Sequence, residues 1–285
     1  MTTGQPEHAG QPGDTGQAGP RKLTPQENAR LAQMKQQFQQ RKALSEKLGR
    51  IKKRIGVYSG KGGVGKTTVA VNLAVTLAQE GGNVGLFDCD IDCPNVTRVL
   101  RISEGPTHEN EVFYPPQAFG VKVMSMAFFQ ENEEEAIIWR GPMIHNAINQ
   151  FLQNTEWGDL DWLVCDLPPG TSDAPLTVMQ TLNLDGFVIV ATPQELAVLD
   201  AKRSINMVKK MKLNVLGIVE NFSGDLFGSG AGEELAAETG VPFLGRVAMR
   251  REYMSAKKPP VLVSDAIADE YQEITKNLRR VIGAG

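Results

Sequence analysis

The chain has 285 residues, and its 30 lysine and arginine side chains against 33 aspartate and glutamate side chains give a formal charge of −3. This length fits one large α/β domain with an extension, and the near-neutral charge gives no overall signal for nucleic-acid binding. No apolar run is long enough to span a membrane, and residues 1–8 lack the basic start and apolar core of a secretory signal. The three cysteines, Cys89, Cys93 and Cys165, indicate a reducing compartment, so we expect a cytoplasmic protein.

The first fifty residues differ in composition from the rest of the chain. Residues 1–22 are rich in glycine, glutamine and proline, with almost nothing to bury, so we expect a disordered tail. In residues 23–50, Thr24 and Glu27 have the spacing of a helix capping box, and apolar residues then recur at helical intervals, which predicts an amphipathic helix. The recurring apolar positions are Leu31, Met34, Phe38, Leu44, Leu48 and Ile51.

The second half of this expected helix is basic. It runs from Lys35 to Arg54 with Glu46 as its one acidic residue. A basic amphipathic helix can bind a membrane surface, nucleic acid or a partner protein. The alternative is a solvated arm whose apolar edge packs on the main domain, and we favour this alternative.

Residues 51–285 alternate between strand-like and helix-like runs and are expected to form one domain. Candidate strands are residues 54–59, 83–87, 120–124, 162–165, 186–191, 215–219 and 243–247. Candidate helices are residues 67–79, 143–153, 199–211, 232–239 and 266–282. This alternation predicts an α/β fold with a doubly wound, mainly parallel sheet and helices on both faces. Ligands of such sheets bind at the carboxyl ends of the strands.

Residues 60–67 read Gly-Lys-Gly-Gly-Val-Gly-Lys-Thr and match the phosphate-loop pattern G-x-x-x-x-G-K-[ST] at every fixed position. A strand is expected before this loop and a helix after it, so backbone N–H groups and the helix dipole would bind phosphate. We expect the nucleotide to contact Gly60, Lys61, Gly62, Gly63, Val64, Gly65, Lys66, Thr67 and Thr68. Lys66 should reach the β- and γ-phosphates, and the Thr67 hydroxyl should hold Mg²⁺.

An acidic cluster follows the second expected strand, where Asp88, Asp90 and Asp92 come just past the strand end. Carboxylates near a polyphosphate are repulsive unless Mg²⁺ or a water molecule is being handled. Asp90 is therefore predicted to position and polarise the attacking water. We expect Asp88 to fix the loop by hydrogen bonds and Asp92 to lie on the surface.

A second acidic site lies at Asp166, where an apolar run predicts a buried strand that ends in a carboxylate of the Mg²⁺ second sphere. Gly170, after Pro168 and Pro169, can bring its N–H close to a γ-phosphate, so this loop would sense hydrolysis. Farther along, Asn221 is expected at a strand end, where its amide can hydrogen-bond an adenine edge.

Two of these strings resemble a known family. Ser59–Thr68, with the extra lysine Lys61, resembles the deviant phosphate loop (deviant Walker A) of the MinD/ParA superfamily. Asp166–Asp173 reads Asp-Leu-Pro-Pro-Gly-Thr-Ser-Asp and closely resembles the signature of Mrp/ApbC-type P-loop ATPases, the iron–sulfur cluster carrier family. Three further segments are similar to the same family, at residues 85–95, 139–142 and 191–201. The resemblance covers about residues 51–282.

The resemblance implies a slow, Mg²⁺-dependent ATPase that works as a homodimer with two nucleotides between its subunits. In that family the residue matching Lys61 reaches the partner's phosphates, the one matching Asp90 serves hydrolysis, and the one matching Asn221 contacts adenine. The implied biological role is iron–sulfur cluster assembly or delivery, with client or scaffold proteins as partners. Neither a specific nucleic acid nor a membrane is expected.

The resemblance breaks at the cluster ligands. Mrp-type proteins usually carry Cys-x-x-Cys shortly after the segment that matches Glu220–Ser223, and four such thiolates across a dimer would hold a [4Fe–4S] cluster. Residues 224–232 of this chain contain no cysteine. Cys89 and Cys93, on either side of Asp90, are an alternative but unspecific pair of ligands, so the presence of a cluster stays open.

Two other functions also stay open. One is a ParA/MinD-like switch that dimerises with ATP and positions a partner on a membrane or DNA without a cluster, which the basic run from Lys35 to Arg54 would favour. The other is a metal-free relative that serves as a partner-binding adaptor.

Overall fold

The computed structural model describes residues 24–27, 30–32, 34–35, 46–129, 141–255 and 257–283. The chain divides into two units, residues 1–43 and residues 44–285. In the first unit, the Glu27 carboxylate accepts hydrogen bonds from the Thr24 N–H and hydroxyl, and the Thr24 hydroxyl accepts one from the Glu27 N–H. The predicted capping box is therefore present, while the predicted tail at residues 1–22 lies outside the described residues.

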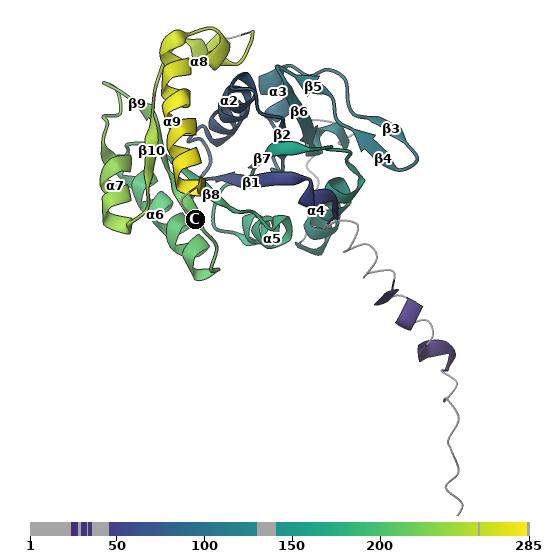
Figure 1. The fold of residues 1–285 in the computed structure, drawn as a ribbon. Helices are drawn as coiled ribbons and strands as arrows, with labels where there is room; N and C mark the ends of the chain where they lie inside the picture. The colour runs from purple at the N-terminus through teal and green to yellow at the C-terminus, as the bar shows by residue number, and fades with distance from the viewer. Residues whose placement is uncertain are drawn as a thin grey trace, which may run out of the picture. The chain divides into compact units, whose positions relative to one another are not determined.

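The second unit is built on a sheet with the strand order β10-β9-β8-β1-β7-β2-β6-β5 (Figure 1). Its strands are β1 (Ile51–Tyr58), β2 (Val84–Asp88), β5 (Gln117–Ala118), β6 (Val121–Ser125), β7 (Leu160–Asp166), β8 (Gly186–Ala191), β9 (Val215–Ser223) and β10 (Phe243–Ala248). Every pairing in it is parallel except that of β5 with β6. A separate hairpin joins β3 (Thr107–Glu109) to β4 (Val112–Tyr114). The predicted mainly parallel sheet is confirmed.

Helices cover both faces of the sheet, which explains why the inner parts of its central strands, such as Ile55–Tyr58 of β1, are apolar and buried. The helical segments are α2 (Lys66–Gln79), α3 (Val96–Leu100), η1 (Met126–Phe129), α4 (Gly141–Asn154), α5 (Asp173–Leu182), α6 (Glu195–Lys210), α7 (Ala231–Thr239), α8 (Glu252–Ser255), η2 (Pro260–Leu262) and α9 (Asp265–Gly283). Buried side chains of α4, α5, α6 and α7 share one core cluster. Those of α2, α3 and α9 share the cluster on the other face.

The final helix, which was predicted at residues 266–282, packs on the core. Ile267, Tyr271, Ile274 and Leu278 of α9 are fully buried. No helix among the described residues has both the length and the apolar content needed to cross a bilayer.

Three local predictions differ from the structure. The basic run from Lys35 to Arg54 was assigned to the helix, but its last part, Ile51–Arg54, begins β1, because the sheet pairs Ile51 with Leu160 of β7. Helix α6 begins at Glu195, four residues before the predicted start. Helix α5 was not predicted, because its Pro175 and the preceding Pro-Pro-Gly indicate a loop, although proline is tolerated in the first turn of a helix.

The helical turn at residues 46–49 is joined to the domain by both apolar and charged contacts. Leu48 belongs to the core cluster on the α4 face, and the Lys47 ammonium donates to the Gln153 carbonyl. Arg50 forms ion pairs with Glu156 and Asp159. Lys52, in β1, likewise pairs with Asp161. These described residues fit the alternative of an arm that packs on the main domain.

We expect the Leu48 contact to matter more for stability than the ion pairs. Leu48→Ala should lower the free energy of unfolding by about 2–3 kcal/mol through the lost burial and the cavity left behind. Lys52→Ala, which removes an exposed ion pair, should lower it by less than about 1 kcal/mol. Urea unfolding of the two variants measures the difference, and equal small losses would contradict the packing of this turn.

Candidate functional site

The site lies at the carboxyl ends of three adjacent central strands. The phosphate loop follows β1 and leads into α2, which begins at Lys66. Asp88 ends β2 and Asp166 ends β7, and the sheet register pairs these two residues directly. Since β7 lies between β1 and β2, the strand order brings the predicted lysine and the predicted carboxylates together.

At Gly65, the phosphate loop has a backbone conformation that only glycine adopts readily. This residue caps α2 in the left-handed region, with φ of 80°, where a side chain is strained. A Cβ there would also lie 2.2 Å from the Asn221 amide nitrogen. Asn221, at the end of β9, donates its amide to the Val64 carbonyl at 2.8 Å and is 2% exposed. The glycine thus lets the loop pack directly against the end of β9.

Lys66 and Thr67 both contact Asp166. The Lys66 ammonium lies 2.6 Å from one Asp166 carboxylate oxygen and 3.6 Å from an Asp90 oxygen. The Thr67 hydroxyl donates to the other Asp166 oxygen at 2.6 Å. Burial by itself would lower the pKa of Lys66, but the charges of Asp166 and Asp90 outweigh burial and raise it. Lys66 therefore stays protonated, which is the state that binds phosphate.

Asp88 organises the segment between β2 and α3. Its carboxylate accepts hydrogen bonds from the Asp90 N–H, the Val96 N–H and the Ser125 hydroxyl. The hydrogen-bonding role expected for Asp88 is thus present. Burial raises the pKa of Asp88 to about 8, and the charge of Asp166 adds to the rise. Asp88 is fully buried and faces inward, so it holds the loop rather than reaching for a ligand.

Asp90 lies closer to the surface of the site. It is 6% exposed, and its carboxylate accepts a hydrogen bond from the Cys93 N–H at 3.3 Å. Burial raises the pKa of Asp90 to about 6, while the charge of Lys66 offsets part of the rise. A carboxylate with a pKa near neutrality and a place beside the phosphate loop can orient a water molecule and polarise it. Asp92 is exposed, as expected.

The donor set fits Mg²⁺. The Thr67 hydroxyl and the Asp166 carboxylate meet at one point, and both are hard oxygen ligands of the kind this cation prefers. Two buried carboxylates, those of Asp90 and Asp166, lie beside one lysine, Lys66. A dication would offset this excess of negative charge.

Two predicted nucleotide contacts are occupied by other partners in the chain. The Gly170 N–H, expected near a γ-phosphate, donates to the Ser59 carbonyl at 3.0 Å. The Asn221 amide, expected at adenine, donates to the Val64 carbonyl. Lys61 is half-buried, and no ion pair within the described ranges involves its side chain. The nucleotide-binding roles of these three residues stay predictions.

Sequence reasoning missed two polar residues at this edge of the sheet. Ser125, which donates to Asp88, is the last residue of β6. The Tyr58 hydroxyl, at the end of β1, donates to the Gly170 carbonyl. In both cases a polar group ends an apolar strand, and that pattern would have selected Ser125.

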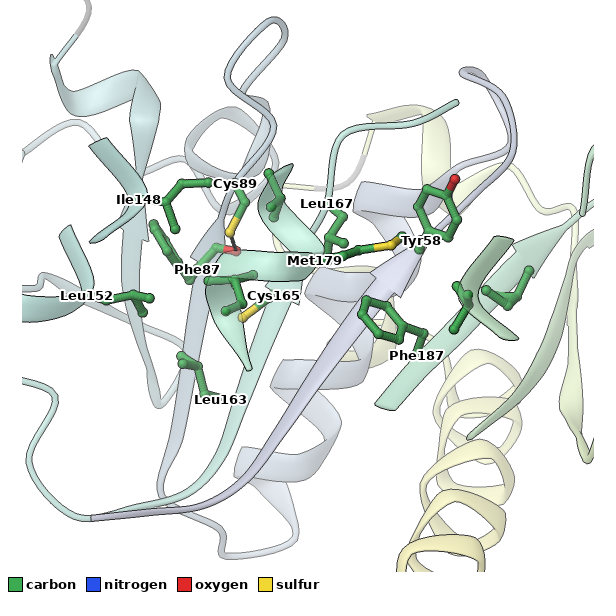
Figure 2. Close-up of a cluster of buried hydrophobic side chains, with 14 of the residues drawn as sticks. Tyr58, Phe87, Cys89, Ile148, Leu152, Leu163, Cys165, Leu167, Met179 and Phe187 are labelled. Carbon is green, nitrogen blue, oxygen red and sulfur yellow. Dashed lines mark hydrogen bonds between the residues drawn. The ribbon is translucent and has the colours of Figure 1, made fainter. Parts of the chain in front are cut away.

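The cysteines do not form an exposed ligand pair. Cys93 is exposed, whereas Cys89 and Cys165 are buried in the core cluster shown in Figure 2. Burial raises the pKa of the Cys89 thiol well above its usual value, although a cluster ligand must be a thiolate. Among the described residues, no group of three or more His, Cys, Asp or Glu side chains is placed to hold a metal ion. The predicted pairing of Cys89 with Cys93 therefore does not fit this conformation.

A buried carboxylate organises the loop at residues 224–232, where the resemblance predicted a Cys-x-x-Cys pair that this sequence lacks. Glu220, fully buried at the end of β9, accepts hydrogen bonds from the Ser223 hydroxyl and from the Gly230 and Gly232 N–H groups. Gly224 and Gly228 exchange two backbone hydrogen bonds across the turn. Glu220 and these backbone bonds thus hold the loop without any metal ligand.

Comparison with known proteins agrees with this geometry. The sequence matches the family described as ParA, NUBPL iron-transfer P-loop NTPase, over residues 50–282. The chain belongs to this family. The resemblance inferred from the phosphate loop and from Asp166–Asp173 is confirmed.

Relatives in the family include named iron–sulfur proteins. The chain is 40% identical to an iron–sulfur cluster carrier protein of Methanocaldococcus jannaschii over 259 residues, which cover 84% of this chain and 88% of that protein. It is 42% identical to an iron–sulfur cluster transfer protein NUBPL of Dictyostelium discoideum over 246 residues, 80% of this chain and 76% of that protein.

Solved structures agree on the fold. A nucleotide-binding protein from Archaeoglobus fulgidus, in complex with ADP, is 37% identical with a TM-score of 0.66, and the match covers 75% of this chain and 88% of that one. The cell division ATPase MinD of Pyrococcus furiosus is 22% identical with a TM-score of 0.64, covering 81% of this chain and all of that one. The second likeness concerns the fold alone.

In the nucleotide-free protein, the ionised Asp90 carboxylate should lower the free energy of unfolding. Because its pKa is higher in the folded chain than the usual 3.8, the folded state binds a proton more tightly, and its contribution to the free energy of unfolding falls as pH rises from about 4 to 6. Asp90→Asn removes this penalty and should stabilise the protein by about 1–3 kcal/mol at pH 7.5, with a smaller gain at pH 5.

Urea unfolding at the two pH values, without Mg²⁺ or nucleotide, measures this effect. Asp92→Asn, a neutral substitution of an exposed carboxylate two residues away, is the matched control and should change little. A destabilised Asp90→Asn variant would show that the buried carboxylate contributes favourable contacts instead.

Proposed function

We propose that the protein is a slow, Mg²⁺-dependent ATPase that acts as a homodimer in iron–sulfur cluster assembly or delivery. The observation that carries this proposal is the convergence of Lys66, Thr67 and Asp166 at the carboxyl ends of β1 and β7. The names of the relatives, iron–sulfur cluster carrier and transfer proteins, support the biological role. We further propose a cytoplasmic location and a division into residues 1–22, 23–50 and 51–285 as tail, helix and ATPase domain.

In this proposal the loop residues 60–68 enclose the phosphates, and Lys66 leaves Asp166 to bind the β- and γ-phosphates. Thr67 would hold Mg²⁺ directly and Asp166 would hold it through water, and the ion would offset phosphate charge. Asp90 orients a water molecule whose oxygen forms a bond to the γ-phosphorus while the bond from that phosphorus to the β–γ bridging oxygen breaks. The products are ADP and inorganic phosphate.

Lys61 is assigned to the partner subunit's nucleotide. Its side chain is half-buried at the loop and has no ion pair in the described ranges, so it is available for a charge outside its own chain. A cation there would stabilise the charge that develops on the transferring phosphoryl group. Hydrolysis would then depend on dimerisation.

The cluster itself is treated as cargo. Cys89 is buried and Cys93 is exposed, so one protomer offers a single accessible thiol among the described residues. We therefore propose that a scaffold or client protein supplies most of the cluster ligands, and that the ATPase cycle controls the encounter between them.

The alternative function, a switch that positions a partner on a membrane or DNA, depended on a free basic helix. Lys47, Arg50 and Lys52 are engaged with the Gln153 carbonyl and with acidic residues of the domain. These contacts remove part of the support for that alternative.

Substitution of the two loop lysines should separate binding from hydrolysis. Lys66→Ala should weaken binding of ATP with Mg²⁺ by about 100-fold or more, since it removes the buried cation of the phosphate loop. Lys61→Ala should leave binding within about threefold and slow phosphate release at least about tenfold. Lys202→Ala, which removes an exposed ion pair with Glu238, is the control and should change neither quantity.

Calorimetry for binding and a phosphate-release assay make these measurements. Unchanged nucleotide binding in Lys66→Ala would overturn the ATPase proposal. Unchanged hydrolysis in Lys61→Ala would overturn only the role assigned across the dimer.

Anaerobic reconstitution with iron and sulfide tests the cargo assignment. We expect the isolated protein to retain little iron and to show no stable visible absorption of a [4Fe–4S] cluster, and Cys93→Ser should not change this result. A brown wild-type protein that becomes colourless in both Cys89→Ser and Cys93→Ser would contradict it, because Cys89 would then have to leave the core.

A further inference from the structure

Gly170, in the loop that follows Asp166, is held from both sides by the residues just before the phosphate loop. Its N–H donates to the Ser59 carbonyl at 3.0 Å, and its carbonyl accepts a hydrogen bond from the Tyr58 hydroxyl. Its φ of 89° lies in the left-handed region that favours glycine. The two bonds therefore fix a residue whose own backbone could adopt several other conformations.

Tyr58 is a rigid anchor for this contact. It is the last residue of β1, pairs with Ile189 of β8 and is fully buried. Figure 2 shows its ring beside Leu167, Met179 and Phe187 in the core cluster, with the hydroxyl at the edge of the group. Burial raises the pKa of Tyr58 to about 12, so the hydroxyl keeps its proton and remains a donor at neutral pH.

We propose that the Tyr58 hydroxyl is a latch that holds the loop at residues 167–172 in a resting position and thereby sets how strongly the protein prefers ATP to ADP. Tyr58 acts as a positioning residue, since its hydroxyl contacts Gly170 and its ring is buried in the core. This inference rests on the proposed ATPase function, in which the Gly170 N–H binds the γ-phosphate.

In this proposal only the γ-phosphate of ATP can release the loop. In the resting position the Gly170 N–H is used by Ser59, so a γ-phosphate must displace that carbonyl and move Gly170 away from Tyr58. ADP has no γ-phosphate and gains nothing from the movement. Only ATP binding therefore shifts the loop, and its apparent affinity is the intrinsic affinity multiplied by the fraction of molecules in which the loop is already released.

Tyr58→Phe removes the latch and keeps the ring that fills the core. The net worth of one hydrogen bond predicts that affinity for a non-hydrolysable ATP analogue rises roughly two- to tenfold, while affinity for ADP stays within experimental error. Tyr271→Phe removes a buried hydroxyl from α9 instead and should change neither affinity. Calorimetry with the ATP analogue and with ADP, each with Mg²⁺, gives the ratio of the two affinities, and this ratio tests the latch.

Hydrogen exchange of the nucleotide-free protein provides a second measurement. The amides of residues 170–172 should exchange roughly two- to tenfold faster in Tyr58→Phe than in wild type, with no change in Tyr271→Phe. Equal changes in ATP and ADP affinity, or a lower ATP affinity, would overturn the latch.

Failure of the latch differs from failure of the proposed function. If wild type and Tyr58→Phe both bind nucleotide with the same ratio of affinities, the ATPase proposal stands and the latch is wrong. If wild type binds no nucleotide, the ATPase proposal fails, and unchanged exchange at residues 170–172 would then also remove the latch.

Discussion

The contact on which the site depends is the buried ion pair of Lys66 with Asp166. The ammonium is 6% exposed and the carboxylate is fully buried, so each charge needs the other to be tolerated in the interior. The pair also fixes the start of α2 against the end of β7. The phosphate loop is the segment between the end of β1 and the start of α2, so the pair fixes one end of this loop. In the proposed ATPase, a nucleotide that drew Lys66 toward its phosphates would leave Asp166 without its cation, so the binding of metal and the binding of nucleotide would depend on each other.

The residues that the structure gathers at the site were largely predictable from the sequence, because they lie in short contiguous strings. The phosphate loop, Asp90 and Asp166 follow from residue types whose spacing is set by a strand and the turn after it. The parallel sheet that gathers them at one edge follows from the alternation of strands and helices, whereas the order of its strands was not predicted. The hydrogen-bonding role of Asp88 was also predicted, but its partner Ser125, at the end of a third strand, was not.

The contacts that were not predicted join segments far apart in the chain. Asn221 reaches Val64 over 157 positions and Tyr58 reaches Gly170 over 112, and no local pattern encodes such meetings. Helix α5 was missed for a different reason, since local propensity at Pro175 opposes a helix that packing on α4 then stabilises. At Cys89 the residue type suggested a ligand, but period-two alternation along β2 and its continuation turns the thiol toward the core.

The two edges of the sheet affect the tendency of this protein to aggregate at high concentration. At one edge β5 has only two residues, and at the other the pairing of β10 with β9 is interrupted by register shifts. Both edges offer few regularly spaced backbone groups to an incoming strand, which is how natural sheets avoid amyloid-like growth. In the proposed homodimer, two copies would meet through the ends of their strands, and edges of this kind would keep their sheets from joining edge to edge.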